Sequence, residues 1–378
     1  MVYPHVYVHV PFCGRRCSYC DFAIAVRKDV PADAFVDAIM AEMVTRRIKL
    51  DPAALRTLYL GGGTPSKLGG AGVARLIREI GQHAGVDNFS TFGGKLEITI
   101  EANPEDVTPE AASQWVESGV NRVSLGVQSF DAGVLTWMHR THGPEAASRA
   151  VGTLRQAGID DISVDLIFAL PGSVERDWSS DLGRALELGP THVSLYGLTV
   201  ETHTPLGRWT ARGEVIEAPE ERYADEFLEA HRRLGDAGFE HYEVSNYSLV
   251  GKRAQHNSAY WSGAAYLGLG PSAHGFDGAT RRWNTSGYVE WMERVAAGED
   301  PKEGDELLTL AERVSEGVYL GLRTTSGLAI YENELKTVTP WIEAGWGGLI
   351  GDRFALTVQG WLRLDSIAAA LTSVRSRS

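Results

Sequence analysis

Cysteine is rare in this sequence, and long apolar runs are missing from it. Only three of the 378 residues are cysteines, and an odd, closely spaced set fits a reducing cytosol rather than a disulfide framework. No uninterrupted apolar run approaches the roughly 20 residues that cross a bilayer, and the first residues lack a basic-then-apolar signal pattern. We therefore expect a cytoplasmic protein without a membrane span, while peripheral membrane contact and a homodimer stay open.

Basic charge is also scarce. The chain has 36 Lys and Arg against 49 Asp and Glu, which gives a formal net charge of −13. Because a general nucleic-acid binder carries a basic face, we expect no nucleic-acid partner. The hydrophobic share of 43% and the charged share of 22% are typical of a globular protein, and a length of 378 residues predicts one large α/β unit with a smaller one.

The three cysteines form one cluster. Cys13, Cys17 and Cys20 lie within eight positions of one another. Three thiolates on one short loop can hold a single soft metal centre, either zinc or an iron–sulfur cluster. Such centres usually have four protein ligands, and the chain has no fourth cysteine, so we expect one coordination position to be open. The alternative is a zinc site completed by His5 or His9.

Six strand–helix units are expected in about the first 200 residues. Apolar alternation and turn residues predict strands over residues 6–10, 57–60, 96–101, 122–128, 162–168 and 192–198, with helices between them. Such regular alternation favours a parallel sheet with helices on its outside. We therefore expect an α/β fold, a partial (βα)6 TIM-like barrel, whose functional groups gather at the carboxyl ends of the strands.

The regular alternation of strands and helices ends at about residue 202. A helix is expected over 219–237, an extended segment over 239–247 and a glycine-rich segment over 266–275. The tail from about residue 301 is expected to be mostly helical, with a hairpin over residues 354–364 and a final short helix. The sequence thus predicts a barrel over residues 1–205, a barrel extension over 206–300 and a smaller C-terminal domain over 301–378.

Glycine and polar residues follow several of the expected strands. Gly61–Gly63 would let a ligand approach the backbone, although a tight turn explains the glycines equally well. Glu101 ends a strand, where a carboxylate can accept both hydroxyls of a ribose or simply be solvated. Gln128 could contact the same ribose. Asp165 lies within an apolar strand, so its burial requires a partner. Arg140 is one candidate, and the alternatives are that its guanidinium binds the carboxylate of a ligand or lies on the surface of a helix.

The C-x3-C-x2-C spacing straight after a strand resembles the radical S-adenosylmethionine (SAM) superfamily. In that family the three cysteines hold three irons of a 4Fe-4S cluster, and the fourth iron binds the amino and carboxylate groups of SAM. The resemblance implies such a cluster on Cys13, Cys17 and Cys20. By position in the family pattern, the SAM-contacting residues would be Tyr7, Tyr19, Gly62, Gly63, Thr64, Glu101, Gln128, Arg140 and Asp165.

Over most of its length the chain is similar to the oxygen-independent coproporphyrinogen III dehydrogenase branch of that superfamily, which includes HemN and the HemW-like haem chaperones. The dehydrogenases continue the cluster motif as C-x-C, whereas here Cys20 is followed by Asp21 and Phe22. They also have a longer arm before the barrel. Residues 256–261 match the H-N-x-x-Y-W motif of the HemW-like members.

The HemW-like resemblance implies that the chain binds haem and passes it to respiratory enzymes. A histidine beside two aromatic residues suits haem, since it offers an iron ligand and flat apolar surfaces, although a buried structural histidine is commoner. The implied haem-binding residues are His256, Asn257, Tyr260 and Trp261. Two alternatives remain: a dehydrogenase that decarboxylates coproporphyrinogen III through a 5′-deoxyadenosyl radical, and a zinc-stabilised binding module.

Overall fold

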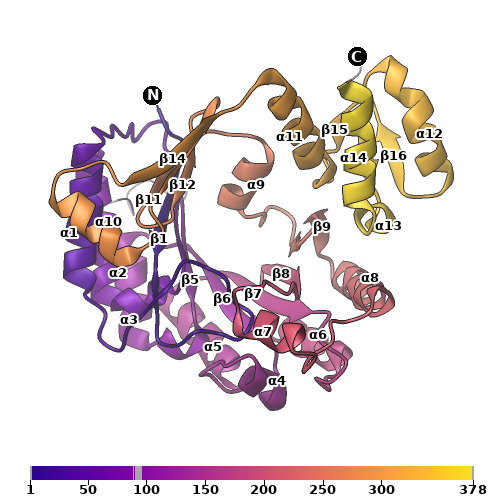
Figure 1. The fold of residues 1–378 in the computed structure, drawn as a ribbon. Coiled ribbons are helices and arrows are strands. Elements are labelled where there is room, and N and C mark those ends of the chain that lie inside the picture. Colours follow the sequence, from indigo (N-terminus) through magenta and orange to yellow (C-terminus); the bar gives the residue numbers. More distant parts are fainter. Residues whose placement is uncertain (1, 88, 90–95, 377–378) are drawn as a thin grey trace.

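A sheet of parallel strands forms the centre of the computed structural model, which describes residues 2–87, 89 and 96–376 (Figure 1). Six strands lie side by side in chain order: β1 (His5–Val10), β4 (Thr57–Gly62), β5 (Glu97–Ala102), β6 (Arg122–Gln128), β7 (Asp161–Phe168) and β8 (His192–Gly197). The helices that follow them are α1 (Ala32–Thr45), α2 (Gly69–His83), α3 (Pro109–Ser118), α4 (Ala132–Trp137), α5 (Ala146–Ala157) and α6 (Trp178–Glu187). The expected (βα)6 partial barrel is confirmed.

Local signals explain where the helices begin and end. Thr108 caps α3 by accepting a hydrogen bond from a backbone N–H, and Pro109 occupies the first helical position. Gly119 and Gly158 end α3 and α5 with φ of 103° and 100°, a left-handed backbone that glycine adopts without strain. Helix α6 begins at Trp178 because Asp177 caps it by accepting a hydrogen bond from the Ser180 N–H.

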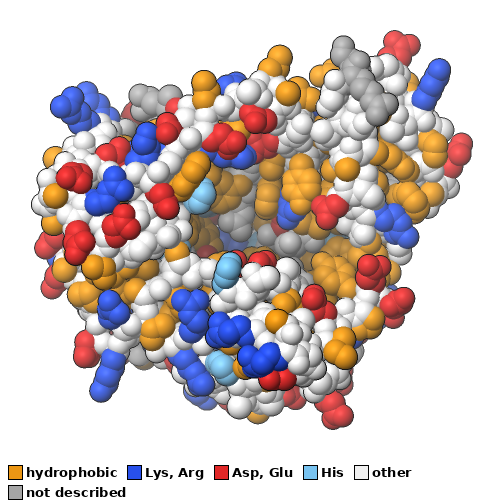
Figure 2. Space-filling model, viewed as in Figure 1, with side chains coloured by type: hydrophobic (Ala, Val, Ile, Leu, Met, Phe, Trp, Pro, Cys, Tyr) orange, Lys and Arg blue, Asp and Glu red, His pale blue; other side chains and the backbone are white. Residues whose placement is uncertain are grey.

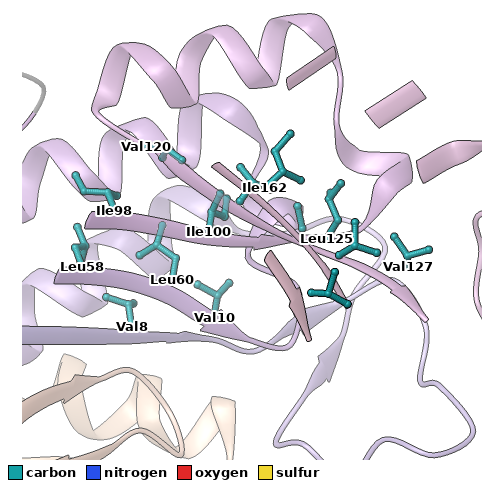
Figure 3. Close-up of a cluster of buried hydrophobic side chains, with 14 of the residues drawn as sticks. Val8, Val10, Leu58, Leu60, Ile98, Ile100, Val120, Leu125, Val127 and Ile162 are labelled. Carbon is teal, nitrogen blue, oxygen red and sulfur yellow. The ribbon is translucent and has the colours of Figure 1, made fainter. Parts of the chain in front are cut away.

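The sheet has an apolar outer face and a polar inner face, since side chains alternate along each strand. Aliphatic side chains such as Val8, Leu60 and Ile100 are fully buried in the core between strands and helices (Figure 3). Burying each of them contributes roughly 1.5–3 kcal/mol. The alternate positions of the first three strands carry His5, Tyr7 and His9, Thr57, Tyr59 and Gly61, and Glu97, Thr99 and Glu101. The inner face can therefore present polar groups to a ligand.

Six further strands extend the sheet at both edges. The segment expected to be extended over 239–247 forms an antiparallel hairpin of β9 (Glu240–Glu243) and β10 (Asn246–Ser248), which pairs with β8. On the other edge β11 (Tyr266–Leu269) pairs in parallel with β1. It is followed by β12 (His274–Phe276), β13 (Thr280–Asn284) and β14 (Lys302–Leu307). The helices of this region are α7 (Pro205–Ala211), α8 (Glu220–Asp236), α9 (Gln255–Trp261) and α10 (Tyr288–Ala296).

The C-terminal part has its own small sheet. Its elements are α11 (Leu310–Leu322), β15 (Leu328–Ala329), α12 (Leu335–Glu343), β16 (Gly347–Ile350), β17 (Arg353–Leu356), α13 (Val358–Trp361) and α14 (Leu364–Arg375). The hairpin expected over 354–364 is wrong. The hairpin is β16–β17, which turns at Gly351 with φ of 63°, whereas Thr357 caps a helix over the following residues. None of the described helices is both long and apolar enough to cross a membrane.

Candidate functional site

The cysteine loop is anchored at both of its ends. Strands β2 (Phe12–Cys13) and β3 (Ala25–Val26) pair in parallel before and after it. Within the loop, the backbone N–H of Ser18 donates to the Met138 carbonyl at 3.2 Å, and the Ser18 carbonyl accepts from the Leu206 N–H at 2.8 Å. These bonds hold the loop over the carboxyl ends of the barrel strands.

A cavity of about 560 Å³ lies beneath this loop. Its size is in the range of small-molecule sites. Most of the residues expected to bind the cluster and SAM line it: Cys13, Cys17, Tyr19, Cys20, Gly62, Gly63, Thr64, Glu101, Gln128, Arg140 and Asp165. Tyr7 is not among the lining residues, and its hydroxyl lies 3.1 Å from Nδ1 of His9. One face of the molecule is hollowed near its centre (Figure 2).

The glycine segment at the end of β4 packs directly against the cysteine loop. A Cβ at Gly63 would lie 2.7 Å from the Pro11 carbonyl oxygen, and Gly62 has a φ of 112°. Both positions therefore need glycine, for space in the first case and for backbone conformation in the second. The Gly62 N–H points to the site, where it donates to Oε2 of Glu101 at 3.0 Å.

Glu101 and Asp165 are half-buried carboxylates of the cavity. The Tyr59 hydroxyl donates to Oε1 of Glu101 at 2.8 Å. Burial raises the pKa of Glu101 to about 7, while the bond from Tyr59 opposes the rise. Asp165 accepts from the hydroxyls of Ser124 and Ser163 at 2.9–3.0 Å, and burial raises its pKa as well. Both groups are thus oriented by hydroxyls before any ligand arrives.

Arg140 does not pair with Asp165, so the first of the roles suggested for it is wrong. Its Nη2 donates to Oδ1 of Asn103 at 2.6 Å and to the Gly126 carbonyl at 2.7 Å. Its Nη1 lies 3.6 Å from Sγ of Cys17, and its buried Nε has no protein partner. The serine hydroxyls satisfy Asp165, which leaves the guanidinium between the cysteine loop and the cavity floor, where it can face an anionic ligand.

The residues fit a cluster better than a single metal ion. The three cysteines line one cavity, with Sγ of Cys13 only 3.4 Å from Oγ1 of Thr64. Across the described ranges, no three His, Cys, Asp or Glu side chains converge to hold one ion. His9 Nε2 lies 2.9 Å from the Ala23 carbonyl, and His5 Nδ1 lies 2.9 Å from Oγ1 of Thr57, at the start of the strand. Neither histidine therefore supports the zinc alternative.

The H-N-x-x-Y-W segment forms α9, which lies away from this cavity. His256 is 1% exposed and lies beside Thr57, at the amino end of β4. Its Nδ1 is 2.6 Å from Oγ1 of Thr57, and its Nε2 is 2.9 Å from the hydroxyl of Tyr260. Burial lowers the pKa of His256 to about 3, so the ring is neutral. Both ring nitrogens have partners, as in a structural histidine.

The other motif residues lie further along α9. Asn257 is half-buried. Trp261 is half-buried too, its Nε1 has no protein partner, and the guanidinium carbon of Arg323 lies 4.5 Å from its ring centre. The structure does not bring this group together with the cysteines, because the two sets are near opposite ends of the barrel.

Sequence reasoning missed four residues that orient the site. The Tyr59 hydroxyl donates to Glu101, the Ser124 and Ser163 hydroxyls donate to Asp165, and Asn103 accepts from Arg140. Tyr59 could have been found from the period of two along β4, which places it on the same face as Gly61. Nothing in the sequence around Asn103 indicated its role, because its partner, Arg140, is 37 positions away.

Comparison with known proteins identifies the family to which this chain belongs. The Radical SAM superfamily model matches residues 7–185. The protein named "Heme chaperone HemW" of Mycobacterium tuberculosis is 36% identical over 372 residues, 97% of this chain and 94% of that protein. Its namesake in Lactococcus lactis is 35% identical over 332 residues, 87% and 84% of the two chains.

One solved structure shares the whole fold. Coproporphyrinogen III oxidase (HemN) from Escherichia coli, described as a radical SAM enzyme, matches 98% of this chain and 91% of its own with a TM-score of 0.80. At 21% identity this likeness concerns the fold alone. Since relatives named HemW exceed 30% identity over most of both chains, this protein belongs to the HemW family of the radical SAM superfamily.

Proposed function

We propose that this protein is a haem chaperone, which binds haem and delivers it to haem-dependent respiratory enzymes. The observation that carries the proposal is the similarity to proteins named haem chaperone over 97% of the chain. Phe22 adds to it, because a coproporphyrinogen dehydrogenase would have a fourth cysteine at this position. Its side chain is 58% exposed beside the cavity, where it leaves the cysteine count at three.

Membership of the superfamily implies a 4Fe-4S cluster and SAM. We assign the cluster to Cys13, Cys17 and Cys20. We assign SAM to the residues of the cavity, with Tyr7 behind them: Tyr19, Gly62, Gly63, Thr64, Glu101, Gln128, Arg140 and Asp165. When bound, the cluster would supply one-electron chemistry and an open iron for SAM. The buried Nε of Arg140 supports this assignment, since a ligand carboxylate would satisfy it.

The haem contact is assigned to α9, through His256, Asn257, Tyr260 and Trp261. Iron ligation by Nε2 of His256 requires the Tyr260 hydroxyl to move away, because the two atoms are 2.9 Å apart. The barrel over 1–205 would hold the cofactors, and the extension over 206–300 would carry the haem motif. Residues 301–378 would form the C-terminal domain, whose first strand, β14, pairs with β13 of the extension. We place the protein in the cytoplasm, where reducing conditions keep the thiols available.

Anaerobic reconstitution followed by haem titration tests the proposal. We expect a shifted haem absorption band for the wild-type protein and a weaker shift for His256→Ala. The Tyr247→Phe variant is the control, because Tyr247 is a fully buried tyrosine of β10 whose hydroxyl has no protein partner. No band shift in the wild-type protein would refute haem binding, and an unchanged shift in His256→Ala would refute the assigned ligand.

Two further measurements separate the alternatives. A dehydrogenase would form protoporphyrinogen from coproporphyrinogen III under anaerobic conditions with a reductant and SAM, and clear turnover would reverse our ranking. A zinc-stabilised module would purify colourless and without iron. The proposed protein is brown when oxygen is excluded, and elemental analysis should find iron but no stoichiometric zinc.

A further inference from the structure

The ring of His256 is fixed in the barrel interior and lies against Tyr59. The two ring centres are 4.9 Å apart, with an angle of 25° between their planes. The bonds of its nitrogens to Thr57 and Tyr260 prevent the imidazole from turning. Tyr260 packs edge-on against the same imidazole at 5.0 Å. Such aromatic contacts favour one orientation of Tyr59 over others.

Helix α9 is itself attached to the sheet. The carboxylate of Glu97 accepts from the backbone N–H groups of Gln255 and His256 at 2.9 and 3.0 Å. Glu97 is the first residue of β5, and Thr57 is the first of β4. The start of α9 therefore cannot shift relative to these two strands without breaking buried bonds, whose loss is costly.

Tyr59 connects this base of the barrel with the cofactor cavity. It lies on the inner face between Thr57 and Gly61, and its hydroxyl donates to Oε1 of Glu101 at 2.8 Å. On its other side the ring packs over Gly61, where a Cβ would come within 2.8 Å of Cε1 of Tyr59. The ring of Tyr59 therefore lies between His256 and Gly61. As a result its hydroxyl donates to the Glu101 carboxylate in a fixed direction.

We propose that His256 and Tyr59 are positioning residues for Glu101, so that α9 sets the affinity of the cavity for the ribose of SAM. The inference rests on the proposed contact of Glu101 with the ribose hydroxyls. It gives His256 a second role, independent of whether the side chain ever binds iron. The H-N-x-x-Y-W segment then connects the proposed haem site with the SAM site through two side chains.

The experiment compares two ligands on cluster-reconstituted protein. SAM contains the ribose, whereas L-methionine offers only the amino and carboxylate groups. We expect Tyr59→Phe, which keeps the ring but removes the hydroxyl, to raise the dissociation constant of SAM about tenfold, as expected for one hydrogen bond to a carboxylate. Methionine binding and iron content should stay as in the wild-type protein. The control is Tyr247→Phe, a fully buried tyrosine of β10 whose hydroxyl has no protein partner.

His256→Ala completes a double-mutant cycle. If His256 acts through Tyr59, it should weaken SAM binding in the same direction, and the double variant should be little worse than Tyr59→Phe alone. Unchanged SAM affinity in Tyr59→Phe, equal losses for SAM and methionine, or additive effects in the double variant would each overturn the inference. Wild-type protein that binds haem but not SAM would refute the proposed SAM site itself, and the inference with it.

Discussion

Replacing Glu42 with alanine is expected to cost more stability than any surface change in this protein. Glu42 is fully buried in α1, and its carboxylate connects α1 with the sheet extension and α10. Arg46 Nη1 donates to it at 2.5 Å, the backbone N–H of Gly270 at 2.9 Å, Nδ2 of Asn284 at 2.8 Å and Nε1 of Trp291 at 3.0 Å. One carboxylate therefore satisfies four buried donors.

The loss of stability is estimated from the buried donors that lose their acceptor when Glu42 is replaced. The Arg46 side chain is 4% exposed, and removing one partner of a buried ion pair costs about 3–5 kcal/mol. Three further donors lose their acceptor, each worth about 1–3 kcal/mol where water cannot replace it. Water entering the vacated space offsets part of this. We expect Glu42→Ala to lower the free energy of unfolding by about 5 kcal/mol, a large fraction of the total for a typical domain.

Urea unfolding of the apoprotein, followed by circular dichroism and by tryptophan fluorescence, measures the loss. Coincident transitions are required before a single free energy is assigned. The matched control is Asp236→Ala, because Arg232 and Asp236 form an ion pair of the same spacing whose side chains are 65% and 73% exposed. This control should change stability by less than about 0.5 kcal/mol. A loss below about 1 kcal/mol for Glu42→Ala would refute the reasoning.

Three other outcomes are expected. Burial raises the pKa of Glu243 from 4.5 to about 7. Ionisation of this carboxyl group therefore lowers the free energy of unfolding as the pH rises from 4.5 to about 7. Glu243→Gln should therefore gain about 3 kcal/mol over wild type at pH 8 but little at pH 4.5, as read from urea midpoints. A Cβ at Gly268 would lie 1.9 Å from the His274 carbonyl oxygen, so Gly268→Ala should unfold the sheet extension, whereas Gly152→Ala in open space should be neutral or stabilising in thermal melts. Cys17→Ser should lower the iron content after anaerobic reconstitution, and unchanged iron would exclude this ligand.

The sequence by itself determined the elements of the barrel. Strand periodicity, the cap at Thr108 and the glycines that end α3 and α5 act within a few residues, so they can be read without a structure. The spacing of the cysteines and the glycines after β4 likewise indicated a cofactor loop at the carboxyl ends of the strands. These signals are local because backbone conformation and hydrogen bonding to the nearest neighbours decide them.

The tertiary structure alone decided which side chains meet. Arg140 contacts Asn103 rather than Asp165, and His256 lies beside Thr57, 199 positions earlier in the chain. The parallel pairing of β11 with β1 and the place of the C-terminal hairpin were equally unreadable from the sequence. Such contacts depend on how the helices and strands pack around a common core, and no short stretch of sequence contains that information.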